Sequence, residues 1–163
     1  ECNSGNYVIR NNYFHENRAR GLLLQSPNGL CENNRFYKTM AQAIKVVMDI
    51  ESVREFCLSR RGAEECLPFD DTTLVYKVMG KMFAVLSLDR TDWLVLKCDP
   101  EYAIELRDSY IGAIEPAWHF NKKYWNQHAI SKLSDSLIKE LIDHSITEVI
   151  KKLPKIRQQE YWG

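Results

Sequence analysis

Four residues have the side-chain chemistry for acid–base or nucleophilic catalysis: His119, His128, Cys66 and Asp70. Catalytic groups work as partners within hydrogen-bond reach of one another. No recognisable spacing connects these four, which favours structural roles for both histidines. The five cysteines, at positions 2, 31, 57, 66 and 98, show neither a CxxC pair nor a zinc spacing. We therefore expect a protein that is not an enzyme and that binds no metal or cofactor.

A second group of residues combines positive charge with aromatic rings. The segment 119–125, HFNKKYW, contains His119, Asn121, Lys122, Lys123 and Trp125. Lysines can bind phosphates, and aromatic rings can stack on bases. The segment therefore predicts a nucleic-acid surface. The alternative is that the tryptophans at 118 and 125 belong to the core and the lysines only solubilise a hairpin tip.

The elements that must position these residues begin with the stretch 74–98. Its apolar, β-branched and aromatic runs predict three successive strands, Leu74–Met79, Met82–Leu88 and Trp93–Cys98. Gly80-Lys81 suits a type II′ turn, which needs φ > 0 at its first central residue. That turn would place Val78 opposite Phe83.

This register assigns the side chains of the three strands to two faces. The predicted core face is apolar; it holds Leu74, Tyr76, Val78, Phe83, Val85, Leu94, Leu96 and Cys98. The predicted opposite face holds Val75, Lys77, Ala84, Leu86, Trp93, Val95 and Lys97. Two lysines in one row cannot both be buried without partners, so we expect this face to be open. It is either a solvated face with extended lysines or, together with Lys81 at the turn, a surface for an anion or acidic partner.

The remaining sequence predicts helices and shorter strands around this meander. Expected helices cover 49–59, ended by Gly62, then 99–110, begun by Asp99-Pro100-Glu101, and a third from a Ser134 cap to Pro154. Expected strands cover 65–69 and two parts of 115–130, and the tail to 163 is expected to fray. This order predicts an α+β fold, a largely antiparallel sheet with its helices packed on one face.

Composition sets limits on the partners. The chain has 22 basic and 22 acidic residues, and residues 48–163 alone have 16 against 19. It therefore lacks an overall basic excess for nucleic acid. No apolar run approaches the length of a membrane span, so we expect no membrane association. The cysteines suggest reduced thiols in the cytoplasm, although a Cys57–Cys66 disulfide stays open.

Residues 1–47 contain an internal repeat with an offset of 22. Asn11-Asn12-Tyr13-Phe14 aligns with Asn33-Asn34-Arg35-Phe36, and 21–24 aligns with 43–46. A period of this size is typical of a parallel β-helix, in which asparagine suits the tight corners and can form ladders. The segments NNYFHENRARGLLLQ and ENNRFYKTMAQAI also resemble late coils of secreted, β-helical α-galactosidases. We therefore expect two parts, a repeat segment 1–47, which a gene fusion or start-site artefact would explain, and a domain 48–163.

Several segments of the second part resemble the MmcQ/YjbR family from about Met48 to Pro154. They are CLSRRGAEECLPFDDTTLVYKVMGKMFAVLSLD, LKCDPE, PAWHFNKKYWNQHAI and LIKELIDHSITEVIKKLP. The resemblance implies a CyaY/frataxin-like fold, a "double-wing" motif and DNA binding. Gln127 departs from the small hydroxyl residue expected after Trp-Asn, which weakens the argument for a shared task of this loop.

From these observations we expect a cytoplasmic, non-enzymatic DNA-binding module, monomeric or weakly dimeric. Its binding residues would be Lys77, Lys81, Trp93, Lys97, His119, Asn121, Lys122, Lys123 and Trp125. The alternative is a protein-interaction adaptor that uses Lys77, Lys97 and Trp93 on the open sheet face. A carbohydrate enzyme is less favoured because most of its fold is missing. So is a frataxin-like metal binder, because arginines alternate with its candidate ligands Glu51, Glu55, Glu64 and Glu65.

Overall fold

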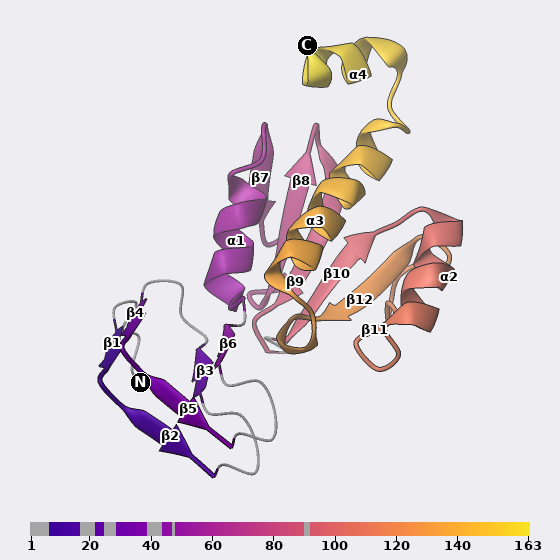
Figure 1. The fold of residues 1–163 in the computed structure, drawn as a ribbon. Helices are drawn as coiled ribbons and strands as arrows, with labels where there is room; N and C mark the ends of the chain where they lie inside the picture. The colour runs from indigo at the N-terminus through magenta and orange to yellow at the C-terminus, as the bar shows by residue number, and fades with distance from the viewer. Residues whose placement is uncertain (1–6, 17–21, 25–28, 39–43, 47, 90–91) are drawn as a thin grey trace. The chain divides into compact units, whose positions relative to one another are not determined.

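Figure 1 shows the computed structural model of the chain, which describes residues 7–16, 22–24, 29–38, 44–46, 48–89 and 92–163. The chain forms two compact units, Glu1–Asp49 and Ile50–Gly163. The strands of the N-terminal unit form two-stranded sheets, whereas those of the C-terminal unit form one six-stranded sheet.

The described residues of the N-terminal unit form three pairs of short parallel strands. β1 (Tyr7–Arg10) pairs with β4 (Gly29–Glu32), β2 (Tyr13–His15) with β5 (Arg35–Tyr37), and β3 (Leu22–Leu24) with β6 (Ile44–Val46). Partners lie 22 positions apart in the chain, as in Tyr13 opposite Arg35. The strand pairing thus has the period of the sequence repeat.

Asparagines shape one corner of this unit. Asn11 and Asn33 have φ of 58° and 53°, a left-handed conformation that asparagine tolerates better than most residues. Asn12 Nδ2 donates to Asn34 Oδ1 over 3.1 Å. Asparagines thus adopt left-handed conformations at equivalent positions of the two repeats, and an equivalent pair forms a hydrogen bond.

The C-terminal unit is built on one antiparallel sheet with the strand order β11-β12-β10-β9-β8-β7. Its strands are β7 (Ala63–Cys66), β8 (Thr73–Val78), β9 (Lys81–Ser87), β10 (Trp93–Lys97), β11 (Ile114–Pro116) and β12 (Trp125–Ala129). Its helices are α1 (Ile50–Leu58), α2 (Pro100–Ser109), α3 (Asp135–Ile150) and α4 (Lys155–Trp162), with a short 3₁₀ turn at Ile130–Lys132. The predicted α+β class and antiparallel meander are confirmed.

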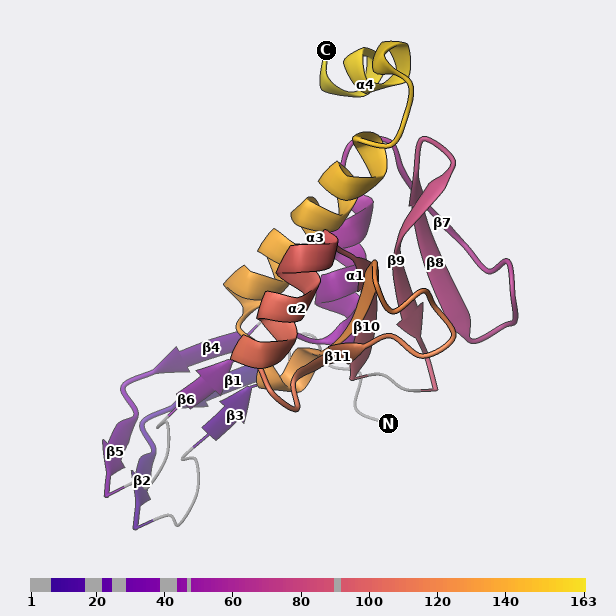
Figure 2. The same ribbon diagram turned by 90° about the vertical axis from the view of Figure 1, so that its right-hand side faces the viewer.

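Three helices cover the same face of this sheet, as Figures 1 and 2 show. α3 packs across β9 and β10, while α1 packs against β7 and α2 against β11. The row Leu74, Leu86, Leu94, His128 and Ile114 crosses the sheet on this side, and all five side chains are buried. We call the other side the helix-free face.

The predicted register of the meander is wrong from the first hairpin onward. The turn residues are Met79 and Gly80, with φ of 50° and 74°, the two positive values of a type I′ turn, and Val78 pairs with Lys81. A β-bulge then follows, because Tyr76 pairs with Ala84 while Lys77 pairs with Met82. Phe83 is the extra residue, and a bulge of one residue exchanges the two faces of the strand.

The bulge corrects the face assignment of β9. Ala84 and Leu86, predicted for the open face, are buried beneath the helices, whereas Val85 and Ser87 lie on the helix-free face. Phe83 is fully buried, as predicted. Ser145 Oγ of α3 donates a hydrogen bond to the Phe83 carbonyl (2.6 Å) and accepts one from the N–H of Lys97 (2.9 Å). The helix thus stabilises the irregular backbone at the bulge.

The predicted helix starts are confirmed at α2 and α3. Asp99 Oδ1 accepts the N–H groups of Glu101 and Tyr102, and Ser134 Oγ accepts the N–H of Leu137. These bonds satisfy amides that have no partner within the first helical turn.

Two boundaries differ from the prediction. The first strand covers 63–66 instead of 65–69, because Pro68 cannot donate to a ladder. The expected frayed tail is a helix, α4, which begins after Pro154 and buries Tyr161. Proline ends α3, but it also suits the start of the next helix.

The described cysteines carry free thiols, so the Cys57–Cys66 disulfide is not formed. Burial raises the pKa of both the Cys57 and Cys98 thiols to about 12, which makes them poor nucleophiles at neutral pH. Nowhere in the ranges that the structure describes is a helix both long and apolar enough to cross a membrane.

Candidate functional site: a pocket and a lysine cluster

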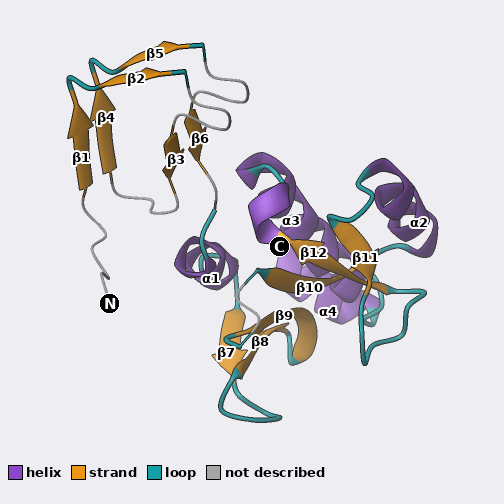
Figure 3. Cartoon of the chain, turned by 90° about the horizontal axis from the view of Figure 1, so that it is seen from below, coloured by secondary structure: helices purple, strands orange, loops and turns teal. Residues whose placement is uncertain are grey.

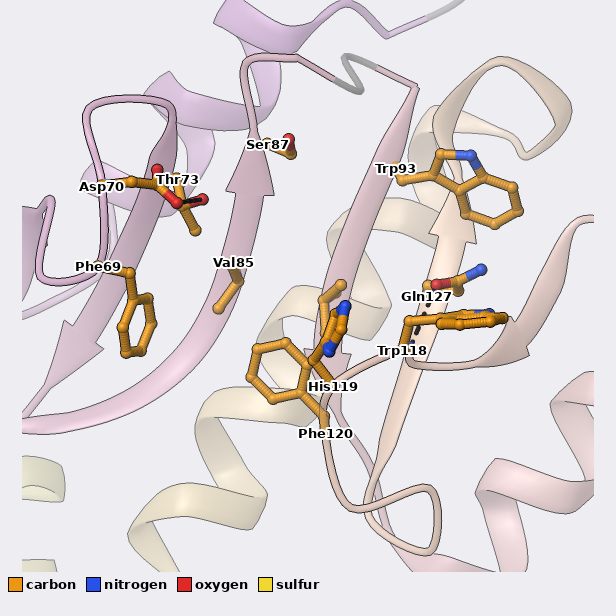
Figure 4. Close-up of a pocket in the computed structure, with 11 residues that line it drawn as sticks. Phe69, Asp70, Thr73, Val85, Ser87, Trp93, Trp118, His119, Phe120 and Gln127 are labelled. Carbon is orange, nitrogen blue, oxygen red and sulfur yellow. Dashed lines mark hydrogen bonds between the residues drawn. The ribbon is translucent and has the colours of Figure 1, made fainter.

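The helix-free face carries a pocket of about 450 Å³ (Figure 4). Its floor comes from β8, β9, β10 and β12, and its walls from the β7–β8 loop and the β11–β12 loop. Figure 3 shows both loops extending away from α3. The lining residues are Phe69, Asp70, Thr73, Val85, Ser87, Trp93, Val95, Trp118, His119, Phe120 and Gln127.

Side chains alternate between the two faces along each strand, and this alternation determines which residues form the pocket floor. Val85, Val95 and Gln127 lie in one cross-strand row, and Trp93 lies two residues before Val95 on the same face. Gln127 is held in place because its Nε2 donates to Glu115 Oε2 (3.1 Å), while its Oε1 accepts the N–H of Trp118 (3.5 Å). Gln127, the residue that departs from the family pattern, therefore anchors the β11–β12 loop, which forms one wall of the pocket.

Aromatic rings on the two loops form the walls. Trp118 is 67% exposed and Phe69 is 65% exposed, so neither ring is buried in the core. His119 has φ of 64°, and this left-handed residue turns the chain between Trp118 and Phe120. The Phe120 ring lies 5.1 Å from the Trp125 ring. The pocket thus presents accessible aromatic surface on both sides of its floor.

Asp70 carries the only fixed charge among the eleven lining residues that the structure describes. Its Oδ1 accepts the N–H and the hydroxyl of Thr72, and its Oδ2 accepts the hydroxyl of Thr73 (3.0 Å). These bonds, led by the one from the Thr72 amide, hold the pKa of Asp70 below its usual value. The carboxylate is therefore ionised at neutral pH and keeps free acceptor positions.

A cluster of lysines borders the pocket. We define the lysine cluster as Lys81, Lys97, Lys123 and Lys152. Lys97 lies opposite Trp125 on the helix-free face, with its Nζ 5.7 Å from that ring centre. Lys152 and Lys123 place their Nζ atoms 4.2 Å and 5.6 Å from the ring centre of Tyr124. Two aromatic residues that follow each other in the chain thus gather three lysines.

The charges of the cluster are not neutralised. Burial first, and then Lys152 and Lys81, lower the pKa of Lys97 against the opposing effect of Glu148. Glu148 itself accepts a bond from Lys151 at 2.7 Å. None of the four lysines forms an ion pair with a carboxylate in the described part of the chain. Neighbouring unpaired cations favour the binding of an anion.

The structure brings together most of the predicted binding residues, but in two groups. Trp93 and His119 line the pocket. Lys81, Lys97, Lys123 and Trp125 belong to the lysine cluster and its rings. Lys77 is separate from both groups because it lies opposite Glu64 of β7.

Two further predicted residues shape the backbone of the β11–β12 loop. Asn121 Oδ1 accepts the N–H of Lys123 (3.0 Å), and the carbonyl of Lys122 accepts a bond from Arg107. The side chains of Asn121 and Lys122 are exposed.

The four candidates for catalysis do not form one constellation. His119 and Asp70 line the pocket, whereas Cys66 Sγ contacts the Val75 carbonyl. His128 is buried in the helix-facing row, where its Nδ1 lies 3.1 Å from the Leu94 carbonyl. Burial lowers the pKa of His128 to about 4. It is therefore a neutral core residue.

The candidate metal ligands are also distributed. Glu65 forms two hydrogen bonds with Arg54, at 2.7 Å and 2.9 Å, and Glu51 lies 3.7 Å from the same guanidinium. No group of three His, Cys, Asp or Glu side chains within the described residues could hold a metal ion. Two of the four candidate ligands, Glu51 and Glu65, are thus paired with Arg54.

Sequence reasoning missed the pocket walls. It placed Phe69 in a strand and Val85 on the core face, and it did not connect Trp118 with Trp93. The usable signal was the polar sequence Asp70-Asp71-Thr72-Thr73 after Pro68, which is typical of a loop. The position of the β9 residues depends on the bulge, for which the sequence has no turn or glycine signal.

Comparison with known proteins identifies the family. The family model described as YjbR matches residues 58–146, more than half of the chain. The chain belongs to the YjbR family. An uncharacterised Escherichia coli O157:H7 protein, YbdF, is 31% identical over 111 residues, which cover 67% of this chain and 90% of YbdF. The uncharacterised YjbR of E. coli K12 is 28% identical over 114 residues, 69% of this chain and 96% of its own length.

A solved structure is similar to the same YjbR-family domain. The crystal structure of Deinococcus radiodurans protein DR2400, with the domain DUF419, has 34% identity and a TM-score of 0.64. The similarity covers 69% of this chain and 86% of that one. The YjbR match, 58–146, contains all the pocket residues and three lysines of the cluster, and it ends before Lys152.

Proposed function

We propose that the C-terminal unit is a non-enzymatic DNA-binding module that holds phosphates on the lysine cluster. The observation that carries this proposal is the gathering of unpaired lysines around Tyr124 and Trp125. Each lysine that contacts a phosphate releases condensed counterions, which makes such binding favourable at low salt. Local clustering supplies the positive surface that the balanced composition lacks.

Several further proposals accompany this one. Helices on one face of an antiparallel sheet support a CyaY/frataxin-like, double-wing assignment. The 22-residue strand pairing supports two β-helix-like coils for the first unit, as in the resemblance to β-helical α-galactosidases. Free thiols support a cytoplasmic location. We take the protein to be a monomer or weak dimer.

The second candidate function is that of a protein-interaction adaptor. It is favoured by the exposed rings of Phe69 and Trp118 on the helix-free face, since accessible apolar surface marks many protein contacts. An adaptor would use the pocket rather than the lysine cluster, and the two candidates therefore depend on different residues.

The test is a fluorescence-anisotropy titration of the full chain with labelled single-stranded and double-stranded DNA at low and physiological salt. Four phosphate contacts predict a slope of log K against log salt of about −3 for the single strand and nearly −4 for the duplex. The double variant Lys123→Glu and Lys152→Glu should weaken binding at low salt by at least tenfold, or about 1.4 kcal/mol.

A matched control carries the same charge change elsewhere. Lys139 lies over Phe56 and Lys155 begins α4; Lys139→Glu with Lys155→Glu should leave most of the affinity intact. Equal losses in both double variants would mean that only net charge matters. Absence of binding by the unaltered protein at low salt would refute the proposal and favour the adaptor.

A further inference from the structure

Lys97 links the pocket to the lysine cluster. Val95 lines the pocket, and Lys97 follows two residues later on the same face of β10. A strand rises by about 3.3 Å per residue, so these positions are roughly 7 Å apart. Phe120 lines the pocket and also contacts Trp125, over which Lys97 lies. A ligand with a flat apolar group beside an anionic group would occupy both.

The pocket has the size and lining of a site for a flat ring. Its volume of about 450 Å³ lies within the range of about 300–1,000 Å³ for small-ligand pockets. Four of its lining residues carry phenyl or indole rings, and Figure 4 shows Trp93 and Trp118 on opposite sides of Gln127. Aromatic rings of this kind form stacking platforms for bases.

We propose that the pocket receives an unpaired base and that the nucleic acid bound by this protein is therefore single-stranded. This inference rests on the proposed function, because the lysine cluster holds the adjoining phosphates. The bases of a duplex are stacked on each other and would have to be flipped out to enter, at a cost of unstacking and unpairing. A single strand offers its bases without that cost.

The position of Asp70 adds a base preference. Its ionised carboxylate lines the pocket and can accept a further hydrogen bond. Cytosine, adenine and guanine carry exocyclic amino groups that can donate to it, whereas the exocyclic groups of thymine are carbonyl acceptors, and they flank its single N3–H donor and repel a carboxylate. The carboxylate also repels phosphate, which keeps the backbone on the side of Lys97. The pocket thus selects bases with an amino group over thymine.

The experiment uses the full chain and three probes of equal length, about ten nucleotides. They are oligo(dC), a duplex, and a strand of abasic deoxyribose phosphates. We expect oligo(dC) to bind about tenfold more tightly than the other two probes and to quench tryptophan emission. The abasic strand has the same phosphates, so it separates base recognition from charge.

Variants assign the effect to the pocket. Trp118→Ala, and independently Phe69→Ala, should remove the preference for oligo(dC) without changing duplex or abasic binding. The matched control is Trp162→Ala, because Trp162 is 60% exposed on α4 outside the pocket. It should bind all three probes as the unaltered chain does. Since both wall residues are exposed, their truncation removes little packed surface.

A fourth probe, oligo(dT), tests Asp70. Oligo(dC) should bind about tenfold more tightly than oligo(dT), and Asp70→Asn should reduce that ratio. Asparagine keeps the Oδ1 acceptor for the Thr72 amide and hydroxyl. A ratio that persists in Asp70→Asn would overturn the assignment of base preference to the carboxylate.

The outcomes separate this inference from the proposed function. Equal affinity for oligo(dC), duplex and abasic strand, with binding still lost on reversing the lysines, would overturn the base pocket and leave the phosphate surface standing. A preference for oligo(dC) that survives both wall variants would also overturn it. If no probe binds at low salt, both proposals fail and the helix-free face is left for a protein partner.

Discussion

The buried imidazole of His128 should make the C-terminal unit sensitive to acid. His128 is 1% exposed and lies between Leu94 and Ile114 in a row of apolar side chains. Its Nδ1–H can donate to the Leu94 carbonyl, and its Nε2 has no hydrogen-bond partner among the described residues. A second proton would create a charge that nothing in this row compensates.

The magnitude follows from the pKa of His128, which burial lowers from 6.5 to about 4. Above pH 6.5 the imidazole is neutral in both the folded and unfolded states, so the contribution of His128 to the free energy of unfolding is fully present. Between these two pKa values the unfolded state binds the proton preferentially, so stability falls as the pH falls. Linkage gives a loss of about 2 kcal/mol in the free energy of unfolding from pH 7 to pH 5. Most of what is left of the His128 contribution is lost by pH 4.

The assay is urea unfolding at pH 7 and pH 5, followed by tryptophan fluorescence. All four tryptophans of the chain, at 93, 118, 125 and 162, lie in the C-terminal unit, so the signal reports that unit. His128→Asn keeps an N–H donor but does not titrate. It should be less stable at pH 7, and its free energy of unfolding should fall by about 2 kcal/mol less than that of the unaltered chain. Equal losses in the two proteins would refute the reasoning.

Three other substitutions test the packing. Ser145→Ala removes two hydrogen bonds at the bulge and should cost about 2–3 kcal/mol in urea unfolding, whereas exposed Ser136→Ala should cost under about 0.5 kcal/mol. Tyr161→Ala should lower the melting temperature because Tyr161 is buried, while Trp162→Ala should leave it nearly unchanged; equal shifts would contradict the docking of α4 through Tyr161. Met79→Asn should raise stability by about 0.5–1 kcal/mol, because asparagine tolerates the positive φ of a type I′ turn; a loss of stability would contradict that turn.

Local signals of the sequence predicted much of this fold. Asp99 followed by Pro100, and Ser134 before an apolar stripe, are signals that act within one helical turn, and both helices begin where these residues predict. The 22-residue offset likewise predicted partners, because equivalent residues of a repeat lie beside each other when coils stack. Such interactions depend on few residues and little on the rest of the chain.

The register of the sheet could not be predicted in the same way. Gly80 marks the hairpin, but the choice between Gly80-Lys81 and Met79-Gly80 as turn residues depends on how the whole strand is buried. The bulge at Phe83 is stabilised by Ser145, which lies 62 positions away in the chain. The pocket also depends on distant parts of the chain, since Val85 and Ser87 reach its floor only through the bulge, and Phe69 and Trp118 line it from two different loops.

The distribution of charge would let a unit without a basic excess hold the polyanion that we propose. Screening limits the influence of a surface charge to about 10 Å at moderate salt, so phosphates respond mainly to nearby charges. The arginines at 54, 60 and 157 are already paired with carboxylates, whereas the lysine cluster has no such partner in the described ranges. The surface beside Tyr124 therefore carries the unpaired charges of Lys123 and Lys152. For this reason the affinity should depend on which lysines are changed, and net charge alone should not determine it.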